Sequence, residues 1–369
     1  MRLLDEQQIA DIATGSAVLG TGGGGDPYLG KLAAIQAVRE FGALELAELD
    51  DLDDDVLVVF PFAIGSPVPF LERITMTDEL IAAYRALERY LGRPIGAVMS
   101  IEIGGINSVL PIAVGRRLGL PVIDGDCMGR AYPEIQLVSL TLFGHPASPL
   151  AVADEHGNVA LFETVSNAWA ERLARPVAVE MGAIAGGVGY PVTVRDLRRA
   201  GLLGTVSLAE RIGAAIRTAR SGGSGGDGGA GPVAACLRAS GGARVFSGRI
   251  VDVRRRTERG WALGETRIAG VDEFAGRELE IRFQNEHLVA LEDGEALVSV
   301  PDLIAILDTE RGDPITTENL RYGFRVTVIA IPSHPLWRTP EGLALGGPRH
   351  FGYDIEFRPV EERFAVAGA

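Results

Sequence analysis

Two aspartates one residue apart directly follow a short apolar run in this chain. The run, residues 120–123, predicts a buried strand, and ligands of open α/β sheets usually bind in the loops after such strands. Asp124 and Asp126 would repel each other unless a cation, a shared proton or water lies between them. Arg130 could supply the cation, and Asp126 could act as a general base. A solvated turn is the alternative, because Asp and Gly favour turns.

A run of four glycines forms a second candidate site near the start of the chain. Their backbone N–H groups have no side chains in the way and can closely approach a ligand. A helix expected over residues 29–41 would direct its N-terminal dipole at the same place. Substrate contact and an ordinary loop both remain open. The residues concerned are Gly22, Gly23, Gly24, Gly25 and Asp26.

The first part of the chain predicts an α/β domain. Apolar runs at 56–60, 94–101 and 120–123 read as buried strands, and helical periodicity covers 77–91 and 108–118. This alternation indicates a doubly wound, largely parallel sheet, with one such sheet formed by residues up to about 142.

The loops after these strands should lie at one edge of that sheet. They carry Glu102, Asn107 and Glu134 beside the two aspartates. The Asn107 amide and the glycine N–H groups are suitable donors to a developing anion. The topology therefore predicts one polar cleft formed from several loops.

The second half of the chain has a different pattern. Helices are expected over 166–173 and 194–220, with a glycine-rich strand region between them. Short alternating strands then follow one another, which predicts a smaller, mainly antiparallel β domain. They cover 243–255, 260–268, 278–283, 287–292, 295–300 and 325–331. We place the α/β domain at 1–168 and the β-rich domain at 169–369. The Gly/Ser segment 221–231 should be a mobile surface loop.

Two further side chains could take part in chemistry. His334 stands between two prolines after a predicted strand, where it could act as an acid or simply pack in a loop. Asp124, Asp126 and His334 together could hold a divalent metal such as zinc, although no metal motif of fixed spacing is present. Cys127 could be a nucleophile only if the fold brings a histidine to it.

Composition narrows the class of protein. The 369 residues carry a formal net charge of -14, and 47% of them are hydrophobic. This acidity argues against nucleic acid and anionic membranes as partners, since both call for a basic surface. Two cysteines cannot build a disulfide framework. The sequence shows no signal-peptide pattern and no apolar run of membrane-spanning length, so we expect a cytoplasmic protein.

Four separated blocks of the chain resemble a known family. They lie at 19–28, 124–134 (without residues 127 and 128), 300–304 and 334–353, the last including His334-Pro335-Leu336-Trp337 and Gly347-Pro348-Arg349. Through these blocks the chain is similar over nearly its whole length to the S-methyl thiohydantoin desulfurase family, formerly a domain of unknown function. The resemblance implies a Rossmann-like domain followed by a β-rich one, and a link to hydantoin metabolism.

The resemblance implies an enzyme that replaces sulfur by oxygen on a thiohydantoin-like ring. Such a reaction needs an activated water, charge stabilisation on the ring and a proton for the leaving thiol. The alternative is a non-catalytic, ligand-binding accessory subunit of a hydantoinase system. In either case we expect a small-molecule ligand and a homo-oligomer.

Overall fold

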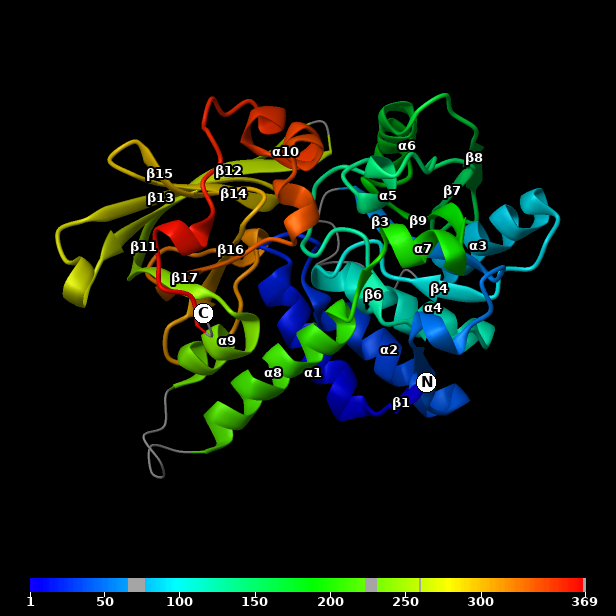
Figure 1. Ribbon diagram of the computed structural model, residues 1–369, viewed down its shortest axis with the longest axis horizontal. Coiled ribbons are helices and arrows are strands. Elements are labelled where there is room, and N and C mark those ends of the chain that lie inside the picture. Colours follow the sequence, from blue (N-terminus) through cyan, green and yellow to red (C-terminus); the bar gives the residue numbers. More distant parts are fainter. Residues whose placement is uncertain (66–76, 223–230, 259, 368–369) are drawn as a thin grey trace.

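The protein is described by a computed structural model that covers residues 1–65, 77–222, 231–258 and 260–367 (Figure 1). Two large sheets, one of eight strands and one of seven, organise these residues, and a third sheet has two short strands. The predicted loop at 221–231 lies largely outside the described residues. No helix in the described part of the chain is both long enough and apolar enough to span a membrane.

The eight-stranded sheet is mixed, and the prediction of a largely parallel sheet is confirmed for part of it. Strands β2, β5, β4 and β3 run parallel to one another, and the remaining pairs of neighbouring strands are antiparallel. The long strand β9 lies after residue 168, where we placed the end of the α/β domain. It nevertheless belongs to this sheet, because it pairs antiparallel with β3. In spatial order the strands are β1 (Arg2–Leu4), β2 (Leu44–Ala47), β5 (Val122–Ile123), β4 (Ala97–Met99), β3 (Leu57–Gly65), β9 (Ile184–Thr193), β7 (Leu150–Ala153) and β8 (Val159–Phe162).

Helices bury both faces of this sheet. Successive β3 residues alternate between two apolar cores, with Leu57 and Val59 in one and Val58 and Phe60 in the other, as expected from the period of two in a strand. The first core takes in α1 (Glu6–Leu19), α2 (Pro27–Phe41), α3 (Thr77–Leu91), α4 (Leu110–Leu118) and α8 (Thr205–Ser221). The second takes in α5 (Ser139–Leu142), α6 (Asn167–Glu180) and α7 (Val194–Ala200).

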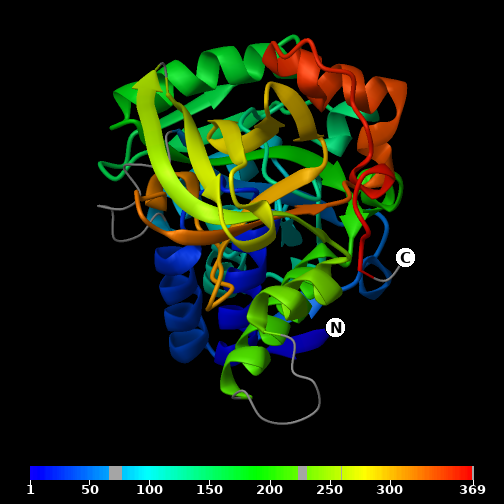
Figure 2. The ribbon, with the colours of Figure 1, turned by 90° about the vertical axis from the view of Figure 1, so that its left-hand side faces the viewer.

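The second sheet is antiparallel throughout and has its own apolar core. Figure 2 looks onto it, with α8 and α9 (Pro232–Ser240) below. A strand at 303–308 was not predicted. The spatial order is β15 (Glu295–Ser299), β14 (Glu286–Glu292), β13 (Glu278–Gln284), β12 (Trp261–Gly270), β11 (Ala243–Glu258), β17 (Arg325–Ile331) and β16 (Leu303–Asp308). The short helix α10 (Pro340–Gly346) follows.

The helix predicted over 194–220 is interrupted. It consists of α7, the short strand β10 (Leu202–Leu203) and α8. Gly204 has a φ of 77° at the start of α8, a left-handed conformation that favours glycine. β10 pairs with β6 (Gly125–Asp126), so the predicted aspartate loop is itself held as a strand.

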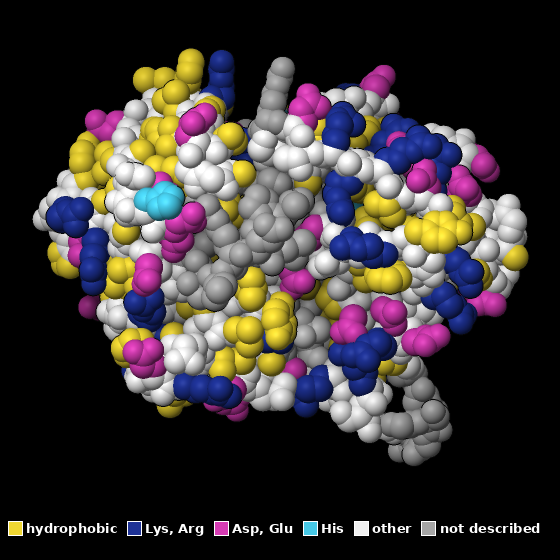
Figure 3. Space-filling model, turned by 180° about the vertical axis from the view of Figure 1, so that it is seen from behind, with side chains coloured by type: hydrophobic (Ala, Val, Ile, Leu, Met, Phe, Trp, Pro, Cys, Tyr) yellow, Lys and Arg dark blue, Asp and Glu magenta, His cyan; other side chains and the backbone are white. Residues whose placement is uncertain are grey.

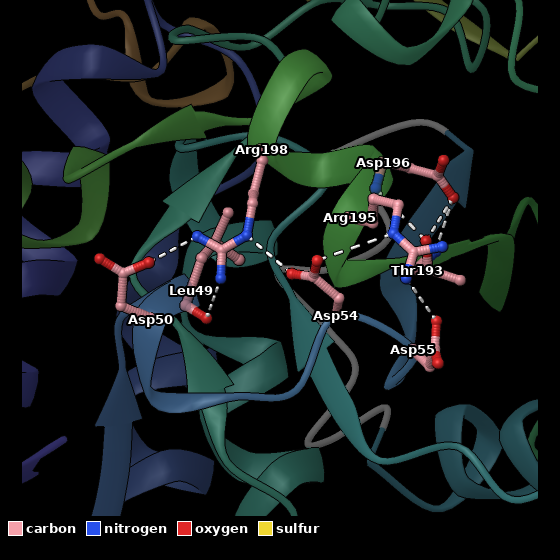
Figure 4. A network of polar contacts seen from close by, with 8 residues as sticks. All are labelled: Leu49, Asp50, Asp54, Asp55, Thr193, Arg195, Asp196 and Arg198. Atoms are coloured by element: carbon pink, nitrogen blue, oxygen red, sulfur yellow. Dashed lines mark hydrogen bonds and ion pairs between the residues drawn. The ribbon is translucent and has the colours of Figure 1, made fainter.

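Charged side chains form ion pairs on the surface. Arg198 of α7 contacts Asp50 and Asp54, and Arg195 contacts Asp54 and Asp55, which ties α7 to the turn before β3 (Figure 4). These side chains are largely exposed, so each pair contributes little to stability. On the face shown in Figure 3, basic and acidic side chains are interspersed.

Candidate functional site

A pocket lies where loops of the eight-stranded sheet meet the start of β14. Its apolar wall comes from β3, β9 and the loops after β4 and β6, and its polar wall from the glycine loop and three carboxyl side chains. The lining residues are Gly24, Gly25, Phe62, Ala63, Ile64, Gly65, Ile101, Glu102, Asn107, Met128, Tyr132, Pro133, Glu134, Ile135, Arg175, Ile184, Asn285 and Glu286. A concave site with an apolar wall and a few convergent polar groups is typical of small-molecule binding.

The glycine loop is held against the second sheet. The His287 backbone N–H donates to Thr21 O at 2.7 Å, and the Gly24 N–H donates to Glu286 Oε1 at 3.2 Å. A Cβ at Gly23 would lie only 2.0 Å from Glu286 Oε1, so glycine is needed for this close approach. Within the described residues the Gly25 N–H donates no hydrogen bond. Gly25 also lines the pocket.

Glu102 is the buried carboxyl on the α/β side of the pocket, with 3% of its surface exposed. Its Oε1 accepts a hydrogen bond from Asn107 Nδ2 at 2.5 Å, and its Oε2 accepts one from Tyr132 N–H at 3.1 Å. Asn107 is oriented in turn because its Oδ1 accepts from Ala63 N–H at 2.8 Å. Glu102 and Asn107, predicted from the loop after one strand, therefore lie together in the pocket.

Glu286 is the buried carboxyl contributed by the second sheet, and the sequence analysis missed it. It is 2% exposed, and its Oε2 has no hydrogen-bond partner among the described residues. The polar triplet Asn285-Glu286-His287 at the start of an otherwise apolar strand was the available signal. His287 beside it is fully buried, and its Nδ1 contacts Ile304 O at 3.0 Å.

Burial dominates the electrostatics of this site. Burial raises the pKa of Glu102 and of Glu286, and the Glu102 charge raises the pKa of Glu286 further. A buried carboxyl without a contacting cation favours its neutral form. Glu102 accepts two N–H hydrogen bonds that stabilise an anion, whereas Glu286 keeps one oxygen without a partner. The surroundings of Glu102 therefore stabilise the ionised carboxylate better than those of Glu286, and Glu286 is the better proton donor.

Asp126, the predicted base, lies behind the pocket and does not line it. It is fully buried, and its Oδ2 accepts hydrogen bonds from three backbone N–H groups. Burial raises its pKa to about 7, although these hydrogen bonds lower it. The three donors are Ile103 at 2.9 Å, Met128 at 2.9 Å and Gly129 at 2.7 Å.

Asp124 and His334 also lie outside the pocket lining. Asp124 Oδ1 accepts from Ser207 N–H at 3.0 Å in the first turn of α8, where a carboxylate satisfies a free helix N–H group. His334 is exposed, and its Nδ1 accepts from Leu336 N–H at 3.2 Å. Among the described residues, no three His, Cys, Asp or Glu side chains lie close enough to hold a metal ion. The proposed zinc ligands therefore do not gather into one site.

The remaining predicted residues have separate positions. Glu134 lines the pocket, and its Oε1 lies 3.4 Å from His350 Nε2. Asp26 lies outside the lining, where its Oδ1 caps α2 by accepting from Tyr28 N–H at 2.9 Å. Gly22 and Gly23 lie behind Gly24 and Gly25, against His287 and Glu286.

Cys127 is fully buried, and burial raises its pKa well above the usual value. A thiol in such surroundings stays protonated, and the thiolate is the reactive form. The environment of Cys127 therefore does not favour a nucleophile.

Fold and site together define a two-sheet α/β protein with a carboxyl-lined pocket where the two sheets meet. Family models match almost the entire chain, the S-Me-THD-like N-terminal domain at residues 7–164 and the S-Me-THD-like C-terminal domain at 165–360. The chain belongs to the S-Me-THD-like family, as its motifs predicted.

The comparison with solved structures supports the fold and carries no information about function. A crystal structure of a protein from Chromobacterium violaceum is similar, with a TM-score of 0.79 and 20% sequence identity over 98% of this chain and 100% of the other. No curated protein matched the chain.

Proposed function

We propose that the chain hydrolyses the carbon–sulfur bond of an S-alkylated thiohydantoin-like ring, with Glu102 and Glu286 as its acid–base groups. The observation that carries the proposal is the pair of buried carboxyls, Glu102 and Glu286, lining one pocket beside the glycine loop. The family is consistent with a thiohydantoin-related activity.

The two carboxyls have complementary roles in addition of water. The Glu102 carboxylate takes a proton from water as the water oxygen bonds to the ring carbon that bears sulfur. Glu286 gives its proton to the adjacent ring nitrogen. The Gly25 N–H and the Asn107 amide line the pocket as donors to the polarised ring.

Collapse of the adduct restores the initial protonation states of Glu102 and Glu286. The hydroxyl proton of the adduct passes to Glu286 as the C=O bond forms. The carbon–sulfur bond breaks, and Glu102 returns its proton to the sulfur, which leaves as a thiol. The net change is one water consumed, one ring C=O and N–H formed, and one thiol released.

An assay with a 2-methylthio-imidazolone tests the proposal. Purified protein should cause loss of ring absorbance together with stoichiometric release of methanethiol. Glu102→Gln and Glu286→Gln should each lower kcat/KM by about a hundredfold or more, since an amide cannot carry the proton. The matched control is Glu318→Gln, a buried carboxyl that does not line this pocket.

The same assay also distinguishes a hydrolase from the alternative, a non-catalytic accessory subunit. Ring binding without turnover would favour a ligand-binding subunit and contradict the hydrolase proposal. Turnover that survives both glutamine substitutions would contradict the assigned acid–base groups.

A further inference from the structure

Arg130 is a buried cation whose hydrogen bonds all go to neutral oxygens. Its side chain is fully buried, and in the described chain no carboxylate lies within ion-pair distance of it. Its guanidinium lies 4.6 Å from the centre of the Tyr132 ring. At 2.9 to 3.2 Å it donates to Ala131 O, Pro301 O, Asp302 O, His287 O and Thr21 Oγ1.

A buried charge without a counter-charge is costly, so the negative charge that balances Arg130 must lie nearby. Three carboxyls act on it electrostatically, those of Glu286, Asp302 and Glu102. The Asp302 carboxylate has its own cation, because its Oδ1 lies 2.7 Å from Arg338 Nη2. Arg338 also contacts Glu361, whose carboxylate is partly exposed to solvent. The Asp302 carboxylate also accepts hydrogen bonds from the N–H groups of Ser333 and Val360. Glu102 and Glu286 are therefore the carboxyls that can balance the charge of Arg130.

The other titratable groups around Glu102 and Glu286 supply no further unpaired cation. His287 is buried beside Glu286, and burial lowers its pKa to about 4, which keeps the ring neutral. Tyr132 is buried, and burial raises its pKa. Asp126 is the other carboxyl near Glu102, and its charge raises the pKa of Glu102. Arg175 also lines the pocket and is buried, but its guanidinium is paired with the Glu171 carboxylate. Among the described residues of this buried cluster, Arg130 is therefore the cation without a contacting carboxylate.

We infer that Arg130 is a positioning residue that balances one negative charge shared by Glu102 and Glu286, so that the pocket of the ligand-free protein holds one carboxylate and one carboxylic acid. Arg130 also fixes the second sheet to the glycine loop, because it donates both to His287 O and to Thr21 Oγ1. The consequence for binding rests on the proposed function. A cluster that is already neutral favours an uncharged ring over an anionic one.

Infrared spectroscopy on the protein without substrate tests the inference. Glutamate labelled with carbon-13 shifts the absorption of protonated Glu carboxyls and separates it from that of Asp. All measurements use a Glu318→Gln background, because burial raises the pKa of Glu318 to about 7 and would add a second signal. At pH 7 the parent should show one protonated buried glutamate.

Glu102→Gln and Glu286→Gln should each abolish that signal, since the remaining carboxyl then ionises opposite Arg130. If each variant keeps a protonated glutamate, the two carboxyls are independently neutral and the inference is wrong. A parent without any protonated glutamate contradicts it as well.

Substitution of Arg130 gives the complementary result. Arg130→Lys should keep one protonated glutamate, and Arg130→Met should show two. Circular dichroism checks that each variant is folded, and the two glutamine variants decide the question if Arg130→Met does not fold. None of these measurements depends on turnover, so a failed desulfurase assay leaves them interpretable.

Discussion

At Asp126 a single carboxylate oxygen organises two loops of the site. Oδ2 accepts from Ile103 N–H next to Glu102, and from Met128 and Gly129 N–H in the loop that leads to Tyr132. Hydrogen bonds to a charged acceptor are stronger than neutral ones. The geometry thus favours a positioning role, whereas the sequence pattern indicated a base.

Two substitutions of Asp126 distinguish these roles. Asparagine retains an acceptor oxygen, so Asp126→Asn should fold and lose less than about tenfold in kcat/KM if the residue only positions loops. Asp126→Ala leaves three buried N–H groups without an acceptor, and each costs about 1–3 kcal/mol. We therefore expect Asp126→Ala to lower Tm strongly. A folded Asp126→Asn protein with a loss of about a hundredfold or more would instead support the general base.

Between elements, the contact of α1 with α8 depends on two glycines. A Cβ at Gly15 of α1 would lie 1.8 Å from Ala209 O, and a Cβ at Gly213 of α8 would lie 1.9 Å from Asp11 O. The two helix backbones thus touch each other directly. Arg217 of α8 adds two hydrogen bonds of 2.8 Å to the Asp11 carboxylate.

Gly213→Ala tests this packing. In an isolated helix, alanine would be more stable than glycine by about 1 kcal/mol. Here the added methyl meets backbone that cannot rotate away, so we expect a lower Tm. Thr218→Ala, at an exposed position of the same helix, is the control and should change Tm little. An unchanged or higher Tm for Gly213→Ala would show that the helices separate without cost.

For the whole molecule, buried carboxyls make stability depend on pH. Burial raises the pKa of both Asp126 and Glu318 to about 7. The folded protein then retains protons that the unfolded chain releases above about pH 4. This contribution to stability is fully present below the unfolded pKa and is lost as the pH rises through about 7.

Glu318→Gln isolates one such group, because glutamine does not titrate. Relative to wild type, the variant should gain Tm between pH 6 and pH 8.5, as the wild-type carboxyl is forced to ionise in a buried position. Thermal melts of both proteins across this range measure the difference. A constant difference in Tm would mean that Glu318 is already ionised at pH 6.

Local sequence determined many of the elements. The helix predicted over 77–91 is α3 with the same bounds, because its apolar residues recur at helical spacing. Most β-rich strands also lie where alternation placed them, and the family follows from short motifs. Glu102 and Asn107 were found because topology places the ends of parallel strands at one edge.

Only the tertiary structure decided the rest. The mixed sheet results from pairing of β3 with β9, which is more than a hundred residues away in sequence, and local periodicity carries no information about such a partner. Glu286 becomes part of the pocket only because β14 docks on the glycine loop and buries its carboxyl. The same docking gives Arg130 neutral partners from the second sheet. Burial and proximity set these roles, and both arise only when distant segments meet.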